Sequence, residues 1–191
     1  MPPIIRFTRE AVLNAAYQLV RREGIDALNA RAVARELGGS TQPIFRLFQN
    51  MDELTEAVRN LAADIFRDSM MKKMELSDNP FLIMGMHYIS YAVEEPELFK
   101  LLFMCDRLSN GWYTRETRAY SFIYDVISSS LNVSHEQAAA LYARVWVYTH
   151  GLAVSIVTKY IPCKSAEEMR AMLTESFLAA AHQLGLNLPE A

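Results

Sequence analysis

Residues 36–54, ELGGSTQPIFRLFQNMDEL, combine two glycines, a Ser-Thr-Gln-Pro run and a lone arginine among apolar residues. The glycines predict the end of one helix, because glycine readily adopts the left-handed conformation that closes a helix. Ser40 or Thr41 can cap the next helix, and Pro43 falls in its first turn, where backbone N–H groups have no intrahelical partner. The stretch therefore predicts a turn followed by a short helix that begins near residue 41.

This short helix has an apolar side, because Ile44 and Phe48 are one turn apart and can dock on the preceding helices. Four residues are left for its outer, N-terminal side: Thr41, Gln42, Phe45 and Arg46. Asn29 can cap another short helix before the glycines. Two short helices around a glycine-containing turn fit a helix-turn-helix, whose second helix enters a major groove of DNA. A surface helical hairpin without a binding role is the alternative.

The rest of the chain also predicts helices, so the expected fold class is all-α with about nine helices. Only 7 of the 191 residues are glycine and 7 are proline, a composition that favours helices over sheets. Capping residues and helix-stopping prolines predict seven further helices: from Thr8 to Gly24, from the Asn50-x-x-Glu53 capping box to about Met74, from Asn79-Pro80 to Pro96, from Pro96 to about Asp106, over 116–131, from Ser134-x-x-Gln137 to about Tyr160, and from Ser165-x-x-Glu168 to about Gly185.

The distribution of charge suggests two domains with different partners. Residues 1–50 carry seven arginines and four acidic residues, a balance of +3, whereas the rest of the chain has a balance of −6. We expect a helix-turn-helix domain over 1–50 and a helical ligand-binding and dimerisation domain over 51–191, joined by the helix that begins at about residue 51. Such asymmetry suggests that the basic N-terminal domain faces nucleic acid and that the acidic remainder of the chain does not.

Other classes of protein find little support in the sequence. The longest uncharged runs, 79–93 and 145–158, are shorter than the roughly 20 apolar residues that a membrane helix requires. The two isolated cysteines and the N-terminus without an apolar signal core indicate a reducing cytoplasm. No zinc-protease, Cys-x-x-Cys, phosphate-loop or nucleophile-elbow motif is present, and the four histidines are scattered. We expect neither an enzyme nor a metal or cofactor site.

Residues 8–58 resemble the DNA-binding region of the TetR/AcrR family of bacterial regulators. The resemblance lies in the Thr8 helix start, an A-x-x-L-x-x-x-x-G segment, an R-x-V-A helix, a Gly-x-Ser turn, an aromatic-x-x-Phe recognition helix and an acidic-Glu-Leu start of the next helix. It implies a homodimer that binds double-stranded DNA at a pseudo-palindromic operator and is released by a small ligand, most simply a repressor. The chain length and helix count fit that family.

The resemblance and the chemistry of the side chains together give a set of candidate DNA-binding residues. Thr41 and Gln42 are placed to reach base edges, since the Gln amide can pair with adenine, and Phe45 could contact a thymine methyl. The full set is Asn29, Arg31, Thr41, Gln42, Pro43, Phe45, Arg46 and Gln49. Arg6 and Arg9 could also reach the neighbouring DNA backbone or the minor groove, although arginines at exposed helix starts are commonly just solvated.

The recognition region departs from the usual family pattern at four positions. Gly39 stands where a small branched residue is common, Phe45 where Tyr often supplies a hydroxyl, Leu47 where His is frequent and Met51 where Lys is frequent. Three of these changes remove groups that would contact the DNA backbone. The alternative function is therefore a TetR-like dimer that binds a ligand or a protein partner and has lost specific DNA binding.

The body of the chain is expected to dimerise and to bind a ligand. Apolar residues surround nearly the whole helix after Ser134, and the last helix has a matching stripe, so these two helices are the expected dimer interface. Trp146 and His150 resemble the Trp-x-x-x-His-Gly pattern of one TetR branch, although a packed aromatic beside a hydrogen-bonded histidine is the simpler interpretation. The candidates for contact with a small, largely apolar ligand are Met84, His87, Tyr88, Tyr91, Phe103, Trp112, Tyr124, Trp146 and His150.

Overall fold

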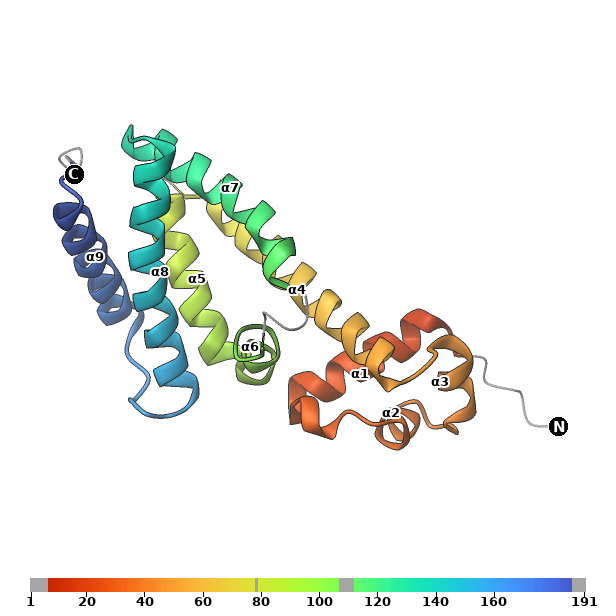
Figure 1. The fold of residues 1–191 in the computed structure, drawn as a ribbon. Helices are drawn as coiled ribbons and strands as arrows, with labels where there is room; N and C mark the ends of the chain where they lie inside the picture. The colour runs from red at the N-terminus through yellow and green to blue at the C-terminus, as the bar shows by residue number, and fades with distance from the viewer. Residues whose placement is uncertain (1–6, 78, 107–111, 187–191) are drawn as a thin grey trace. The chain divides into compact units, whose positions relative to one another are not determined.

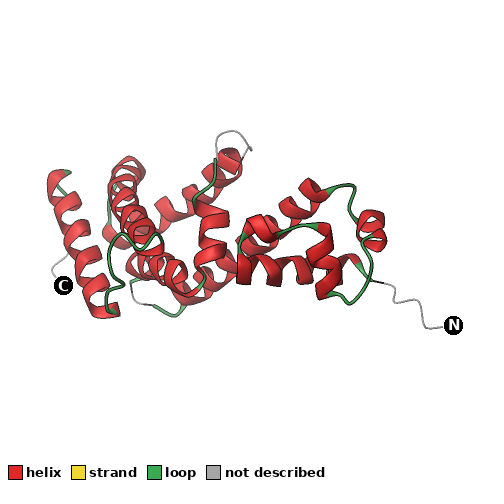
Figure 2. Ribbon diagram, turned by 90° about the horizontal axis from the view of Figure 1, so that it is seen from below, coloured by secondary structure: helices red, strands yellow, loops and turns green. Residues whose placement is uncertain are grey.

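The computed structural model describes residues 7–77, 79–106 and 112–186, with the backbone alone for 112–121. Every regular element in this part of the chain is helical, which confirms the predicted all-α class (Figures 1 and 2). The elements are α1 (Arg9–Glu23), a short 3-10 turn (Ile25–Ala27), α2 (Ala30–Glu36), α3 (Gln42–Leu47), α4 (Met51–Glu75), α5 (Pro80–Glu94), α6 (Pro96–Phe103), α7 (Trp112–Leu131), α8 (His135–Val157) and α9 (Ala166–Gln183).

Several of these helices start where the sequence places a capping side chain. Thr8 and Asn29 accept hydrogen bonds from backbone N–H groups at the starts of α1 and α2. Ser134 and Ser165 open α8 and α9 with complete capping boxes. The predicted side-chain cap of α3 is wrong. Thr41 occupies the N-cap position, but its side chain accepts no hydrogen bond from the helix.

The contacts between helices divide the chain into two compact units. The N-terminal unit contains α1 to α3, the part of α4 up to Ser69, and α6; the C-terminal unit contains Met70–Glu94 and the described residues after Cys105. The boundary predicted at residue 50 differs from this division. The first turns of α4 bury Leu54 and Val58 completely in the N-terminal unit, and α6 buries Leu98 there in the same way.

In the N-terminal unit, α1 is the central helix and packs against α2, α3 and α6. Ile44 and Phe48 of α3 are each 1 % exposed, which confirms the predicted apolar side of that helix. In the last turn of α1, Arg21 forms an ion pair with Glu95, the residue before α6. The two short helices α2 and α3 are thus packed against the longer α1.

In the C-terminal unit, α8 packs against α5, α7 and α9, as Figure 1 shows. The apolar residues of α8 that led us to expect a second protomer are buried by these neighbours: Leu141, Tyr142, Val145, Leu152, Ala153, Ile156 and Val157. These neighbours therefore account for the buried apolar residues of α8 within one protomer. Over the described residues, no helix is both long enough and apolar enough to span a membrane.

Candidate functional site

The recognition helix α3 leaves its outer side open within the N-terminal unit. Gln42 and Arg46 are exposed, and the ring of Phe45 is 50 % exposed although it is large and apolar. Thr41 and Pro43 are half-buried at the start of the helix. The structure therefore brings the predicted base-contacting residues together on one side, opposite the buried Ile44 and Phe48.

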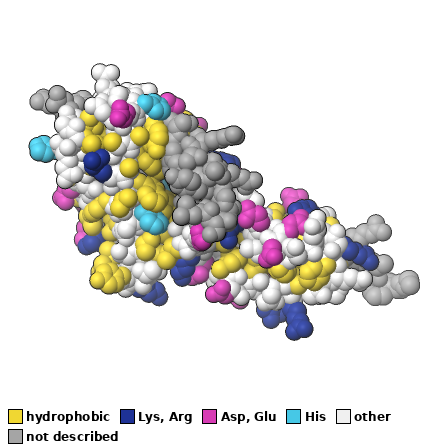
Figure 3. Space-filling view, in the orientation of Figure 1, with side chains coloured by type: hydrophobic (Ala, Val, Ile, Leu, Met, Phe, Trp, Pro, Cys, Tyr) yellow, Lys and Arg dark blue, Asp and Glu magenta, His cyan; other side chains and the backbone are white. Residues whose placement is uncertain are grey.

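The arginines of the N-terminal unit fall into two groups. One group forms ion pairs with carboxylates of the same unit: Arg9, Arg21, Arg22, Arg59 and Arg67. Three arginines in the described part of the unit are exposed and make no ion pair: Arg31, Arg35 and Arg46. Figure 3 shows basic side chains projecting from the surface of this unit. Because a cation that is already paired gains less from a phosphate, the second group supplies most of the free positive charge.

Sequence reasoning had selected Arg31 and Arg46 from this group but had missed Arg35. The signal was present, since Arg31 and Arg35 are four residues apart on α2 and residues at this spacing share one helix face. The sequence did not reveal which arginines form ion pairs with carboxylates. Glu36 pairs with Arg22 of α1 rather than with a neighbour on its own helix, at an N–O distance of 2.8 Å.

Asn29 and Gln49 differ from the other candidates, because each is tied to the fold. The Asn29 carbonyl oxygen accepts a hydrogen bond from the Ala32 N–H at 3.0 Å, and its amide donates to the Ala27 carbonyl at 3.1 Å. The backbone N–H of Gln49 donates to Glu53 at 2.7 Å, while its side chain is exposed. A DNA contact by Asn29 would use the remaining amide hydrogen, and a contact by Gln49 its free side chain.

Arg9 connects α1 to the end of the recognition helix. Its guanidinium donates to the Leu47 carbonyl oxygen at 2.6 Å and to Glu53 Oε1 at 2.9 Å. The guanidinium carbon also lies 4.0 Å from the ring centroid of Phe48, a cation–π contact. The hydrogen bond from Gln49 and then the one from Arg9 lower the pKa of Glu53 below its ordinary value, so this carboxylate is ionised at neutral pH.

Three of the ligand candidates in the C-terminal unit, Tyr88, Trp146 and His150, form a polar and aromatic cluster. The hydroxyl of Tyr88 lies 2.8 Å from Nδ1 of His150, and the Trp146 ring stacks on the His150 ring with a centroid distance of 4.9 Å. This is the packed aromatic and hydrogen-bonded histidine that the sequence favoured. Nearby in α5, the buried His87 lies 3.1 Å from Lys73 Nζ through its Nδ1 atom.

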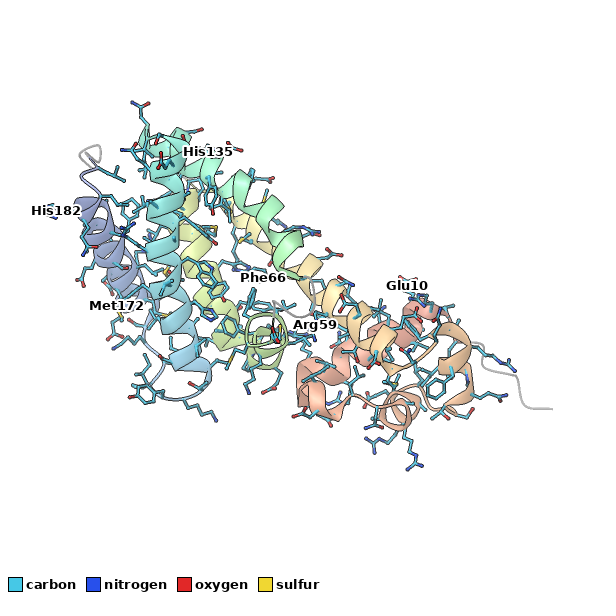
Figure 4. The ribbon with its side chains drawn as sticks, viewed as in Figure 1. Glu10, Arg59, Phe66, His135, Met172 and His182 are labelled. Carbon is cyan, nitrogen blue, oxygen red and sulfur yellow. The ribbon has the colours of Figure 1, made fainter. Side chains whose placement is uncertain are left out.

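The other ligand candidates are more scattered. Tyr91 is buried beside the ring of His87, and Met84 packs against the core that contains Leu141 and Tyr142. Tyr124 packs edge-on against Tyr142 and against His135 at the start of α8, which Figure 4 labels. The side chain of Trp112 lies outside the described residues.

Phe103 differs from the other ligand candidates because it belongs to the N-terminal unit. It packs there against Phe66 of α4 and Phe99, with centroid distances of 5.1 Å in both cases (Figure 4). Among the described residues, no group of three or more His, Cys, Asp or Glu side chains is arranged to hold a metal ion.

Comparison with known proteins supports the interpretation of the N-terminal unit. Residues 12–58 match the family model of bacterial regulatory proteins of the tetR family. Over 161 residues the chain is 26 % identical to an uncharacterized HTH-type transcriptional regulator of Mycobacterium tuberculosis, Rv0681. The match covers 80 % of this chain and 72 % of that relative.

Solved structures extend the similarity to the whole fold. A TetR family transcription regulator from Marinobacter aquaeolei superposes with a TM-score of 0.64 at 16 % identity, covering 90 % of this chain and 94 % of that protein. The multidrug binding protein EbrR, solved with imidazole, gives a TM-score of 0.60 at 18 % identity, covering 96 % and 97 % of the two chains. At such low identity these two likenesses concern the fold.

Proposed function

We propose that the chain is a TetR-family transcriptional regulator, as its similarity to that family supports, and that it binds a pseudo-palindromic DNA operator as a homodimer and is released by a small ligand. We expect a repressor that acts in the cytoplasm. The observation that carries the proposal is the exposed outer side of α3, where Gln42, Phe45 and Arg46 face away from a fully packed apolar side. A helix of this shape suits a major groove, in which amide and guanidinium groups read base edges.

The free arginines give this interface its charge. Arg31 and Arg35 on α2 and Arg46 on α3 are the exposed cations without an ion pair in the described part of the N-terminal unit. Their contacts with phosphates would offset the backbone-binding groups that the recognition region lacks. Each such contact releases counterions, which makes binding dependent on salt.

Dimerisation through α8 and α9 is supported by apolar side chains that their own protomer leaves uncovered. Val147 is 66 % exposed on α8, and Leu178 is 50 % exposed on α9. Gly151 lies one turn after Val147, and no heavy atom is within 4 Å of where its Cβ would stand. Figure 3 shows hydrophobic side chains gathered over α8. We expect these two helices to meet their copies in a four-helix arrangement around a two-fold axis.

For ligand binding we propose the C-terminal unit, with the group formed by Tyr88, Trp146 and His150 as its polar feature. EbrR, whose fold is similar, is described as a multidrug binding protein, which favours a ligand of largely apolar character here as well. We further propose that the Trp-x-x-x-His-Gly segment places the chain in the branch that shares this pattern. In this view the segment holds Tyr88 against α8.

The alternative is a TetR-like dimer that binds a ligand or partner without specific DNA binding. The absent Tyr, His and Lys equivalents at Phe45, Leu47 and Met51 favour it. The two functions separate in a mobility-shift assay with the DNA that precedes the chain's own gene, in the presence of excess unrelated DNA. Specific binding that is lost in Gln42→Ala and weakened in Arg46→Ala supports the proposal. Equal affinity for both DNAs in the wild type would reject it in favour of the alternative.

A further inference from the structure

The recognition helix is too short to be held by its own hydrogen bonds. It has six residues, whereas isolated helices become stable in water only at about 12–15 residues. Its buried side is fixed by Ile44 and Phe48. Its C-terminal end needs a separate support, because the last carbonyl groups of a helix have no partners within it.

Arg9 supplies that support from α1. The Leu47 carbonyl that accepts its hydrogen bond at 2.6 Å belongs to the last residue of α3. A cation at this position also complements the negative end of the helix dipole. The same guanidinium lies over the Phe48 ring, so it contacts two consecutive residues at the point where α3 ends.

Glu53 holds the same segment from α4, and we call the pair formed by Arg9 and Glu53 the clamp. One of its carboxylate oxygens accepts from Arg9 at 2.9 Å, and the other accepts from the Gln49 N–H at 2.7 Å. Residues 47–49 are therefore held between a guanidinium and a carboxylate that are themselves paired. Because the planar guanidinium can donate in several directions while it stacks, Lys could not make all these contacts at once.

We propose that Arg9 is a positioning residue for DNA recognition: it sets the orientation of α3 in the groove and makes no contact with DNA. This inference rests on the proposed operator binding. It assigns Arg9 a role that differs from the phosphate contact considered from the sequence alone. The two roles predict different salt dependence, since only a phosphate contact changes the slope of log K against log salt.

The test compares Arg9→Gln and Arg9→Lys with Arg21→Gln. Arg21 is a matched control, because its side chain is 48 % exposed against 51 % for Arg9 and its ion pair with Glu95 does not touch α3. Two properties are measured: amide hydrogen exchange at residues 47–49 without DNA, and the operator dissociation constant across a range of KCl concentrations. Thermal unfolding identifies any variant that fails to fold, and Glu53→Gln then replaces Arg9→Gln.

We expect Arg9→Gln to accelerate exchange at residues 47–49 and to weaken operator binding about five- to tenfold with an unchanged salt slope, as the loss of an exposed ion pair and a cation–π contact implies. Arg9→Lys should recover only part of the affinity, and Arg21→Gln should change neither property. A salt slope reduced by about 0.9, or an unchanged affinity, would overturn the proposal. If the wild type bound no specific DNA, the proposed function would fail and this inference could be judged by exchange alone. Unaltered amide hydrogen exchange at residues 47–49 in Arg9→Gln would refute the clamp.

Discussion

The ring of Phe7 occupies the space into which a side chain at Gly39 would project. A Cβ built on Gly39 would lie 2.6 Å from two ring carbons of Phe7, closer than such atoms approach in proteins. The turn before α3 therefore has no free space for a side chain at position 39.

We predict that Gly39→Ala destabilises the N-terminal unit, because the added methyl group must displace the Phe7 ring. Overpacking of this kind costs about 1–3 kcal/mol. Thermal or urea unfolding of Gly39→Ala, Phe7→Ala and the double variant measures the effect. The double variant should be more stable than the sum of the two single effects implies. Additive effects would show that the two residues do not compete for the same space.

Local signals in the sequence were sufficient to predict most helix starts and the outward side of α3. Capping at Ser134 and Ser165 depends only on residues within one turn, and the burial of Ile44 and Phe48 follows from helical periodicity. Such features are set by neighbours in the chain, so a single sequence contains them.

Features that depend on distant residues could not be predicted in the same way. The assignment of α6 to the N-terminal unit depends on where Leu98 and its neighbours are buried, far from α1 in sequence. The pairing of Arg9 with Glu53 likewise joins residues 44 positions apart. Periodicity identifies which face of a helix is apolar, but it does not identify the partner that covers the face.

The separation of paired from free arginines predicts how the proposed operator binding depends on salt. Replacing Arg31, Arg35 or Arg46 by Gln should reduce the magnitude of the slope of log K against log salt by about 0.9 for each phosphate contact that is lost. Arg22→Gln is the control, because Arg22 already pairs with Glu23 and Glu36. Fluorescence anisotropy with a labelled operator at several KCl concentrations gives the slopes. An equal reduction in all four variants would contradict the division into two groups.

The proposed dimerisation through α8 and α9 predicts that a charge at Val147 dissociates the dimer. In Val147→Glu a carboxylate would have to be desolvated in the interface, which should raise the dimer dissociation constant about tenfold or more. Sedimentation velocity over a range of protein concentrations measures the change. Val93→Glu places the same substitution at an exposed position on α5, and it should leave the oligomeric state unaltered. Unchanged dimers of Val147→Glu would place the interface elsewhere.

The capping box of α9 predicts a specific loss of stability in acid. The Ser165 backbone N–H, then its hydroxyl, and then the charge of Lys164 hold the pKa of Glu168 below its ordinary value. Ionised Glu168 therefore stabilises the folded state above the ordinary carboxyl range, and this stabilisation is lost as the pH falls through the lowered pKa. In Glu168→Gln the amide keeps the hydrogen-bond acceptor but cannot ionise.

Urea unfolding at neutral pH and at roughly pH 3 should therefore distinguish charge from hydrogen bonding. Glu168→Gln should be less stable than the wild type at neutral pH, and this difference should become smaller in acid, whereas Glu168→Ala should be less stable at both. Glu167→Gln removes a charge from the same first turn outside the capping box, and serves as the control. A constant difference between wild type and Glu168→Gln at both pH values would contradict the lowered pKa.

The end of α8 contains a residue in an unfavourable backbone conformation. The helix ends at Val157, before the predicted Tyr160, because Lys159 adopts a φ of 59° and the N–H of Tyr160 donates to the Ser155 carbonyl. The ends of α2, α7 and α9 use the same closing hydrogen bond with Gly38, Asn132 and Gly185 at the corresponding position. Lys gives no sequence signal for this conformation, so the early stop was not predictable.

We expect Lys159→Gly to stabilise the C-terminal unit by about 1 kcal/mol, because glycine adopts a positive φ without the steric cost that a Cβ imposes. Thermal unfolding of the variant measures the gain. Asn132→Gly is the matched control and should change stability less, since Asn tolerates the left-handed region better than Lys. A loss of stability in Lys159→Gly would mean that the greater freedom of glycine in the unfolded chain outweighs the relief of strain.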